Sequence, residues 1–319
     1  MKQKLINFLS KFEKENIKKS FPLDYCLPVY HCVSDESLPH LNHIIKYKNV
    51  KQFEDDLDYF SKYFQFVNWD EFKDFFTGNF KPKKKIALLT FDDGFREFYD
   101  VVAPILERKG IYAINFVNPA FIDNKDLMFR CKSSLIIDTI NHSKLKNSEI
   151  NIEEVLKINY QNKIQLDEIA EKLDINFESY LKNQKPYLDC DQLKNLTAKG
   201  FGISAHSWDH PLYCELKLQD QLENTLKSLH FTRENNFLDD SFAFPFSDFG
   251  VEKDFFESLF ENQQLSYTFG CAGIKVDSCE KNLQRIPMET GESASQTLQK
   301  EIAYFKFKKL LNKNTIIRK

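Results

Sequence analysis

The sequence contains few residues that break regular structure and no surplus of positive charge. Only 9 of its 319 residues are glycine and 10 are proline, and no tract rich in serine, glycine or proline marks a linker between domains. The 44 Lys and Arg residues are outnumbered by 47 Asp and Glu residues, which gives a formal net charge of −3. No nucleic-acid partner is expected, because phosphate backbones select basic surfaces.

Long apolar runs are also absent. No stretch approaches the roughly 18 consecutive apolar residues that a membrane-spanning helix requires, so no membrane span is expected. The opening residues carry charges every few positions and lack an apolar core followed by a small-residue cleavage site, so no secretory signal is expected either. Together these features predict a cytoplasmic location.

The cysteines form no Cys-x-x-Cys pair. Their odd number and wide spacing argue against a disulfide framework and against a zinc finger. We expect most of them to be reduced thiols in the core, and the set comprises seven residues: Cys26, Cys32, Cys131, Cys190, Cys214, Cys271 and Cys279.

Short apolar runs alternate with helical patterns along most of the chain. This alternation predicts an α/β fold in which parallel strands are joined by crossover helices. The expected strands span residues 27–33, 64–67, 86–91, 112–117, 202–206, 242–246 and 266–269. The expected helices span residues 50–64, 70–76, 95–109, 219–235 and 251–263.

The stretch from residue 123 to residue 196 interrupts this rhythm. It is long and polar, and it contains helical patterns without a convincing strand. We interpret residues 123–196 as a helical insertion in a main domain formed by residues 21–122 and 197–319, with residues 1–20 as an N-terminal helical extension. A separate small domain explains the inserted stretch equally well.

Polar residues follow four of the expected strands at their carboxyl ends. Parallel α/β sheets and barrels place their chemistry at this edge. The strand-end residues should therefore meet at one rim, and they are His31, Asp92, Asp93, His206, Ser247 and Asp248.

Asp92 and Asp93 end an apolar strand and are followed directly by Gly94. A tight turn, which glycine permits, can aim one carboxylate at a metal ion and the other at a water molecule. An ordinary turn with Asp93 as the cap of the next helix explains the same residues.

His206 and His210 are four residues apart and are followed by Pro211. One helical turn would bring both imidazoles onto one face, where they could bind a single ion. With one carboxylate added, three protein ligands leave positions open for water and substrate, as in catalytic metal sites. A divalent ion that lowers the pKa of water, beside a carboxylate that removes the proton, predicts hydrolysis of an amide or an ester.

Taken together, TFDDG at residues 90–94 and HSWDH at residues 206–210 resemble the first two motifs of the polysaccharide deacetylases with NodB homology, carbohydrate esterase family 4. The resemblance implies a distorted (β/α) barrel with about seven parallel strands. It also implies a hydrolase that removes an acetyl group from the amide nitrogen of an N-acylated sugar. Asp92 would be the general base, and a divalent metal ion, usually Zn²⁺ with Co²⁺, Ni²⁺, Fe²⁺ or Mn²⁺ as alternatives, would be bound by Asp93, His206 and His210.

The segment YHCVSD at residues 30–35 is similar to the start of one branch of this family, which includes deacetylases of poly-N-acetylglucosamine. In that branch the motif order is permuted and the early histidine is the general acid, a role that the resemblance gives to His31. Histidine suits this role because it titrates near neutrality and the leaving amine must be protonated. A buried imidazole that only satisfies a backbone carbonyl is the alternative.

The third family motif is altered at residues 243–247, because its arginine is absent and its tyrosine is replaced by Phe246. Pro245 and Phe246 keep the wall of the groove, and in the family's geometry the backbone N–H of Phe246 would still stabilise an oxyanion. Arg285 is a candidate to orient Asp92 in place of the missing arginine, with a structural role as the alternative. Trp208 is a candidate to stack on a sugar, although packing explains most aromatic residues of this chain.

The expected substrate is an N-acylated sugar or glycan precursor, such as a lipid-linked or nucleotide-linked sugar, because no export signal is expected. A deformylase or an O-acetyl esterase would use the same residues. A catalytically silent carbohydrate-binding or scaffolding protein is a further alternative, suggested by the altered third motif. The carboxylate pair and both histidines argue against it, and the sequence does not indicate an oligomeric state.

Overall fold

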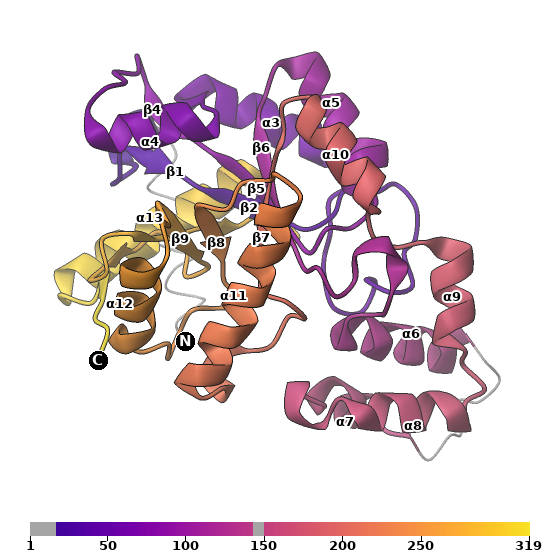
Figure 1. Cartoon of the computed structure of the whole chain (residues 1–319). Helices are drawn as coiled ribbons and strands as arrows, with labels where there is room; N and C mark the ends of the chain where they lie inside the picture. The colour runs from indigo at the N-terminus through magenta and orange to yellow at the C-terminus, as the bar shows by residue number, and fades with distance from the viewer. Residues whose placement is uncertain (1–16, 143–149) are drawn as a thin grey trace.

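The main sheet consists of parallel strands that curve into a nearly closed barrel (Figure 1). The computed structural model describes residues 17–142 and 150–319. The sheet has eight strands in the order β11-β9-β8-β7-β6-β5-β2-β12. In chain order they are β2 (Pro28–Tyr30), β5 (Leu89–Asp92), β6 (Ala113–Val117), β7 (Gly202–Ala205), β8 (Ser241–Ala243), β9 (Tyr267–Gly270), β11 (Asn282–Gln284) and β12 (Ile286–Pro287). The α/β class, the parallel pairing and the distorted barrel are confirmed.

A single extended segment closes the barrel. Only Arg285 separates β11 from β12, and β11 pairs with β9 while β12 pairs with β2 at the opposite edge. The backbone N–H of Arg285 donates to the carbonyl of Gly270 at 3.1 Å, and the N–H of Ile286 donates to the carbonyl of Leu27 at 2.8 Å. Because β11 and β12 are two halves of one segment, the barrel has seven strand positions, as the family resemblance implied. Only six of the seven strands expected from the apolar runs lie in it, and β11 and β12 were not among them.

Two small parallel sheets flank the barrel. The first has the order β1-β4-β3, with β1 (Tyr25–Cys26), β3 (Phe64–Phe66) and β4 (Lys85–Ala87). The strand expected at residues 64–67 thus exists as β3 but is not part of the barrel, and the strand expected at 86–91 is divided at Leu88 between β4 and β5. The second sheet pairs β10 (Val276–Asp277) with β13 (Thr315–Ile316), which the periodicity did not predict.

Helices cover the outside of the barrel (Figure 1). Asn49 and Asn68 cap two of them, the helices that begin at Val50 and Trp69. In each capping box the asparagine side chain accepts from the third helical N–H, and the side chain at that position accepts from the asparagine N–H. The outer helices are α2 (Ile17–Ser20), α3 (Val50–Tyr63), α4 (Trp69–Thr77), α5 (Ala103–Lys109) preceded by a π-helical turn (Phe98–Val102), α10 (Cys190–Ala198), α11 (Leu218–Glu234), α12 (Lys253–Asn262) and α13 (Ala294–Leu310). Short 3₁₀ turns occur at Ile122–Asn124, Tyr160–Asn162 and Tyr213–Glu215.

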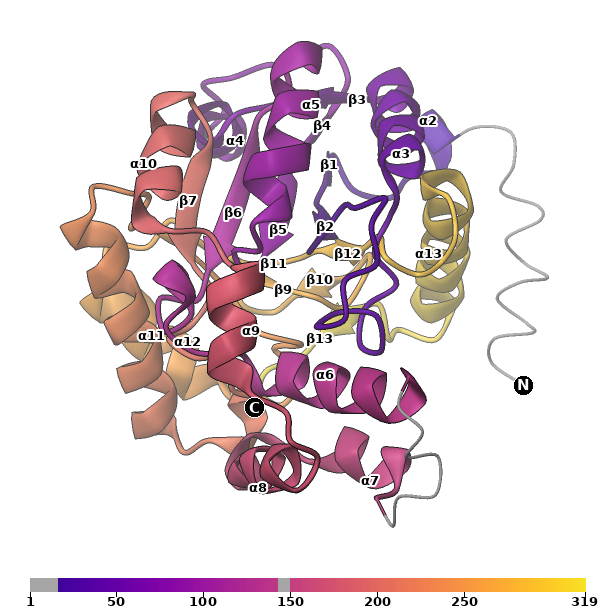
Figure 2. The same cartoon turned by 90° about the vertical axis from the view of Figure 1, so that its right-hand side faces the viewer.

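Four helices follow β6 before α10, three of them at the bottom of Figure 2 and the last upright above them. They are α6 (Phe129–His142), α7 (Ile152–Lys157), α8 (Ile164–Lys172) and α9 (Phe177–Gln184). Their facing sides form an apolar cluster of their own, which includes Phe129, Ile136, Val155 and Leu166. Helix α10 returns to the barrel and packs beside β7, so the part of 123–196 that stands apart ends before Cys190. A second side of α6 and α9 packs against the main domain, because Cys131, Leu135 and Leu181 share an apolar cluster with Phe95 and Phe121.

Three further features bear on the expectations from the sequence. Of the predicted N-terminal helical extension, residues 1–16 lie outside the described residues, and Ile17–Ser20 form α2. All seven cysteines are free, but only three of them are buried, so the prediction that most lie in the core is wrong. No helix among residues 17–142 and 150–319 has the length and apolar composition to cross a membrane.

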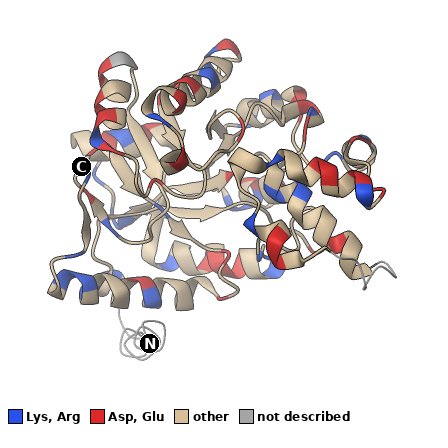
Figure 3. Ribbon diagram, turned by 90° about the horizontal axis from the view of Figure 1, so that it is seen from below, with Lys and Arg blue, Asp and Glu red and all other residues tan. Residues whose placement is uncertain are grey.

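Charged residues of both signs lie along the same helices (Figure 3). On α3, Lys51 and Asp55 form an ion pair at 2.8 Å one turn apart, and near the end of α11 Arg233 pairs with Asp239 at 2.9 Å. Such exposed pairs contribute little to stability, about 0–1 kcal/mol each, and mainly keep the surface charge mixed.

Candidate metal and catalytic centre

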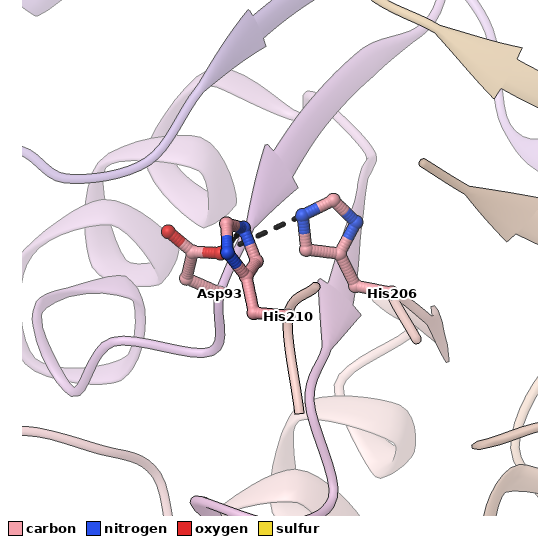
Figure 4. A group of neighbouring side chains, drawn as sticks. All are labelled: Asp93, His206 and His210. Atoms are coloured by element: carbon pink, nitrogen blue, oxygen red, sulfur yellow. Dashed lines mark ion pairs between the residues drawn. The ribbon is translucent and has the colours of Figure 1, made fainter. Parts of the chain in front are cut away.

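Asp93, His206 and His210 lie together inside the barrel although more than a hundred residues separate the carboxylate from the imidazoles. One potential ligand atom from each residue lies within 4.8 Å of the other two, and all three side chains are buried. The Nε2 atoms of His210 and His206 are 3.2 and 3.5 Å from Oδ1 of Asp93. Figure 4 shows both imidazoles turned toward this carboxylate.

A left-handed turn at the end of β5 separates the two neighbouring carboxylates. Asp93 has a φ of 73° and Gly94 has a φ of 70°, a region that disfavours residues with a Cβ atom. At Gly94 a Cβ would lie only 3.1 Å from Cγ1 of Val117. The turn aims Asp93 at the histidines, while Asp92, still in β5, faces the barrel interior.

The segment from His206 to His210 is a loop, so the predicted helical turn is wrong. Ser207 and His210 have φ values of 72° and 61°, which an α-helix cannot contain. The side-chain amide of Asn118 donates to the carbonyls of His206 and Ser207, and the Ser207 hydroxyl accepts from the N–H of His210 at 3.1 Å. These bonds hold the loop in a shape that brings both imidazoles to Asp93 without a helix. Backbone strain of this kind is concentrated at functional sites.

The donor set fits a divalent cation. Nδ1 of His206 donates to the carbonyl of Ala243 at 2.9 Å, which leaves its Nε2 as the lone-pair nitrogen facing Asp93. Among the described residues, neither Nε2 of His206 nor Oδ1 of Asp93 has a hydrogen-bond partner, although both are buried. Orphaned buried polar atoms are costly, and a cation ligated by them would remove that cost.

Two of the three side chains have the protonation states that metal ligands require. Burial lowers the pKa of His206 to about 4, so its imidazole is neutral near pH 7. Burial alone would raise the pKa of Asp93, but the neighbouring His210 outweighs this effect, so the pKa lies well below its ordinary value. A neutral imidazole and an ionised carboxylate are the forms that coordinate metals.

Arg285 forms a two-pronged ion pair with Asp92. Its Nη1 and Nη2 donate to Oδ1 and Oδ2 of Asp92 at 2.6 and 2.8 Å, and both side chains are buried. Burial would raise the pKa of Asp92, but the guanidinium of Arg285 outweighs it and lowers the pKa. The guanidinium also lies over the ring of Phe116 at 5.4 Å from the centroid. Of the two interpretations of Arg285 from the sequence, this geometry favours the one in which it orients Asp92.

His31, at the end of β2, is paired with a carboxylate that the sequence reasoning overlooked. Its Nδ1 lies 2.5 Å from Oε2 of Glu289, and the N–H groups of His31 and Cys32 donate to Oε1 of the same residue at 3.0 and 2.9 Å. Burial lowers the pKa of His31, but Glu289 more than compensates and raises it to about 10. Glu289 follows the short strand β12, so the strand-end rule that selected His31 and Asp92 would also have selected it.

These groups open into a cavity of about 470 Å³. Its inner end is lined by His31, Asp92, Asp93 and His210, and Phe246 packs edge-on against the His210 ring at 4.4 Å between centroids. Phe246 is 40% exposed and has a left-handed backbone, with a φ of 54°. Its other walls come from the loop after β2 and from the inserted helices α6 and α7.

The remaining candidates lie elsewhere. Trp208 lines a neighbouring cavity of about 450 Å³, with Nζ of Lys227 over its ring at 3.8 Å from the centroid. Pro245 lies between Phe244 and Phe246, which both line the Asp92 cavity. Asp248 was expected at the rim, but it is buried and bonded to Asn282, Gln284 and Arg318. Its placement at the rim was wrong, because these partners draw the carboxylate toward β11 and away from the cavity.

Comparisons with known proteins agree with this geometry. Residues 79–239 match the family model described as polysaccharide deacetylase. No curated protein sequence matches the chain. The fold is similar to the deacetylase PplD of Streptococcus pyogenes in complex with acetate (TM-score 0.57, 16% identity, 87% of this chain and 97% of that chain). It is also similar to IcaB from Ammonifex degensii (TM-score 0.55, 16% identity, 87% and 97% covered) and to a de-N-acetylase from Aggregatibacter actinomycetemcomitans (TM-score 0.57, 14% identity, 86% and 99% covered).

Proposed function

Since the chain belongs to the polysaccharide deacetylase family, a family of hydrolases, we propose that it removes an acetyl group from the amide nitrogen of an N-acylated sugar and that it depends on a divalent metal ion. The observation that carries the metal dependence is the buried cluster of Asp93, His206 and His210 with its unpartnered ligand atoms. We propose Zn²⁺ as the ion, because two imidazoles and one carboxylate are a common ligand set of catalytic zinc. Co²⁺, Ni²⁺, Fe²⁺ and Mn²⁺ are the alternatives that a metal analysis would distinguish.

In this proposal Asp92 is the general base. A divalent cation held by Asp93, His206 and His210 would lower the pKa of a water molecule and polarise the acyl carbonyl. Asp92 lines the same cavity and takes the proton from the attacking water. Arg285 holds both carboxylate oxygens in a fixed plane and keeps Asp92 ionised at neutral pH, so that the base is always in its proton-accepting form.

His31 is the general acid in the same scheme. The nitrogen of a cleaved amide must gain a proton to leave, and a pKa raised to about 10 keeps His31 protonated at neutral pH. Glu289 fixes the ring through Nδ1, so Nε2 is the atom that delivers the proton. The backbone N–H of Phe246 is proposed as the oxyanion donor, and Pro245 with Phe246 as the wall beside it.

The acetyl amide is proposed over other acyl groups because two structural neighbours are named as a deacetylase in complex with acetate and as a de-N-acetylase. Formyl amides and O-acetyl esters use the same chemistry and serve as comparison substrates. A cytoplasmic location belongs to the same proposal, and cell fractionation would test it.

The test combines metal analysis with acyl release. We expect the purified protein to contain about one equivalent of a divalent metal, and acetate release from N-acetylated sugars to stop with a chelator and resume when metal is added back. Asp93→Ala should lose the metal and the activity. Asp92→Asn should keep the metal and lower turnover by about 10²–10⁴-fold, the contribution typical of a general base.

Asp239→Asn, which changes an exposed aspartate paired with Arg233, is the matched control and should keep both properties. Full metal binding by Asp93→Ala would refute the ligand assignment, and unchanged turnover by Asp92→Asn would refute the base. If formate, or acetate from an O-acetyl ester, were released faster than acetate from an N-acetyl amide, the proposed N-acetyl substrate would be wrong.

A further inference from the structure

Arg130 of the inserted helix α6 lines the same cavity as Asp92 and Asp93. Its Nη1 donates to the carbonyl of Leu156 in α7 at 2.7 Å, which ties the two inserted helices together. The guanidinium carbon lies 5.0 Å from the ring centroid of Phe129 and 5.9 Å from that of Phe246. One hydrogen bond and two aromatic rings thus position the guanidinium of Arg130, and this bond uses only one of its N–H donors.

The charge of Arg130 is not neutralised by the protein. The side chain is half-buried, and no carboxylate of the described residues forms an ion pair with it. Glu215 acts on it only from a distance, and burial lowers the pKa of Arg130 below its ordinary value. By contrast, the nearby Lys132 and Lys163 of the insertion pair with Asp167 and Asp209 at 2.9 and 3.1 Å. A half-buried cation without a counter-ion is unfavourable, and an anionic ligand would compensate it.

The position of Arg130 relates it to the reacting centre. The ring of Phe246 contacts both the His210 ring, at 4.4 Å between centroids, and the guanidinium of Arg130. One aromatic ring therefore separates a metal-ligand candidate from the free cation. These two contacts limit the separation between the His210 ring and the guanidinium carbon to about 10 Å, which an N-acylated sugar with one further substituent can bridge, so an anion on Arg130 would belong to a substituent of the sugar whose amide is cleaved.

Outside the catalytic residues, the cavity that Arg130 lines is mainly apolar; His43 also lines it, and its Nε2 is paired with Oδ1 of Asp138 at 3.2 Å. Ile44 and Ile45 of the loop after β2, Met128 before α6 and Leu156 of α7 line the cavity. Leu156 is 38% exposed, so it presents apolar surface to a ligand and not to the protein core. A nucleoside would need hydrogen-bonding partners for its base, which these side chains do not provide, whereas an alkyl or isoprenoid chain is matched by them.

From these observations we propose that Arg130 binds a phosphate group of the substrate, and that the substrate is an N-acylated sugar joined through this phosphate to an apolar chain. Arginine suits this role because its planar fork matches the oxygens of a phosphate group. The inference rests on the proposed function of the site and narrows its substrate class. Arg130 is a specificity-determining residue in this account and takes no part in the cleavage.

The test uses substrates that share one N-acetylated sugar and differ at the anomeric position: the methyl glycoside, the 1-phosphate, the uridine diphosphate derivative and a phosphate ester of a short isoprenoid alcohol. For Arg130→Gln we expect KM for the phosphate-bearing substrates to rise about 10- to 100-fold with little change in kcat, since hydrogen bonds to charged groups have this strength. The methyl glycoside should be hydrolysed equally by both proteins. Arg130→Lys should recover only part of the loss, because it keeps the charge but not the fork.

Arg233→Gln, the same substitution at an exposed arginine of α11, is the matched control and should leave every KM unchanged. Leu156→Ser should weaken the isoprenoid substrate selectively. If Arg130→Gln hydrolysed the methyl glycoside as poorly as the phosphate-bearing substrates, Arg130 would have a structural role and the proposal would be overturned. A preference of the wild type for the uridine diphosphate derivative over the isoprenoid phosphate would overturn its apolar-chain part.

A binding measurement separates this inference from the proposed function. Calorimetric titration of the chelator-treated protein with the isoprenoid phosphate should show binding that Arg130→Gln weakens and that the methyl glycoside does not reproduce. If no amide is hydrolysed but this binding is present, the deacetylase proposal fails and the Arg130 site stands. If hydrolysis occurs without any preference for phosphate, the Arg130 site fails and the deacetylase stands.

Discussion

The guanidinium of Arg285 and the carboxylate of Asp92 form two parallel hydrogen bonds across 193 positions of sequence. Both partners are buried, and Oδ2 of Asp92 also lies 3.6 Å from Nε2 of His206. The pair therefore links the strand that closes the barrel to the edge of the metal-ligand cluster. A charge pair of this kind is required as a unit, because either partner alone would be an uncompensated buried charge.

Replacing Arg285 with glutamine should lower the free energy of unfolding by about 3–5 kcal/mol, since Asp92 would remain buried without its partner. Urea denaturation monitored by circular dichroism measures this change. The double variant Asp92→Asn with Arg285→Gln removes both charges and should be more stable than Arg285→Gln alone, by at least about 1 kcal/mol. Simple additivity of the two single changes would contradict the coupling.

A second prediction concerns the pH dependence of turnover. Because Glu289 raises the pKa of His31 to about 10, the acid form persists at neutral pH and is lost only as the pH rises through that value. Glu289→Gln removes the charge that raises the pKa, so the alkaline limb of kcat should move down toward the ordinary histidine value of about 6.5. Proton NMR titration of the His31 ring in the same variant should show the same displacement.

The sign of the accompanying stability effect follows from the same pKa. A histidine whose pKa is raised by folding stabilises the fold fully at any pH below its pKa in the unfolded chain. This contribution is lost as the pH rises through its pKa in the folded protein, which is about 10 for His31. Glu234→Gln is the matched control, because Glu234 pairs with the exposed His230 at 3.1 Å and lies away from the cavity. An alkaline limb that stays in place in Glu289→Gln would contradict the assignment of His31 as the acid.

The third prediction uses two glycines with the same backbone conformation. Gly94 and Gly78 have φ values of 70° and 80°, but a Cβ at Gly78 would meet no atom within 4 Å, whereas at Gly94 it would press on Val117. Gly78→Ala should cost about 1–2 kcal/mol from the left-handed backbone alone. Gly94→Ala should cost more by about 1–3 kcal/mol, the usual penalty for overpacking.

Thermal or urea unfolding of both glycine variants gives the comparison. Gly94→Ala should also bind metal more weakly, because Asp93 precedes it in the turn, while Gly78→Ala should bind it normally. Equal losses of stability in the two variants would show that the contact with Val117 does not constrain the turn.

The sequence was sufficient to predict that Asp92, Asp93 and His206 lie close together, because parallel strands end at one edge and these residues follow short apolar runs. It did not reveal how the barrel closes. Strands β11 and β12 have three and two residues, too few for a periodic signal, so Arg285 was a candidate with two interpretations and Glu289 was not named.

Other differences between the predictions and the structure arise because one sequence pattern is compatible with two local structures. Histidines four residues apart meet on a helix, but they also meet in a loop when Asn118 and Ser207 supply the bonds that a helix would supply. Helix α13 was not expected, because its apolar residues are spread around the helix and not gathered on one side. Asp248 satisfied the strand-end rule and still points elsewhere, since the rule is silent about long-range partners such as Arg318.

Strands β11 and β12, which close the barrel, are separated by a single residue, Arg285. During synthesis the carboxylates of β5 emerge almost two hundred residues before the arginine that orients one of them. Until this segment reaches both free edges of the sheet, Asp92 has no fixed direction and the barrel has no closed wall. A chain in which this segment has not joined both edges therefore lacks the closed wall and also the orientation of Asp92 on which the proposed reaction depends.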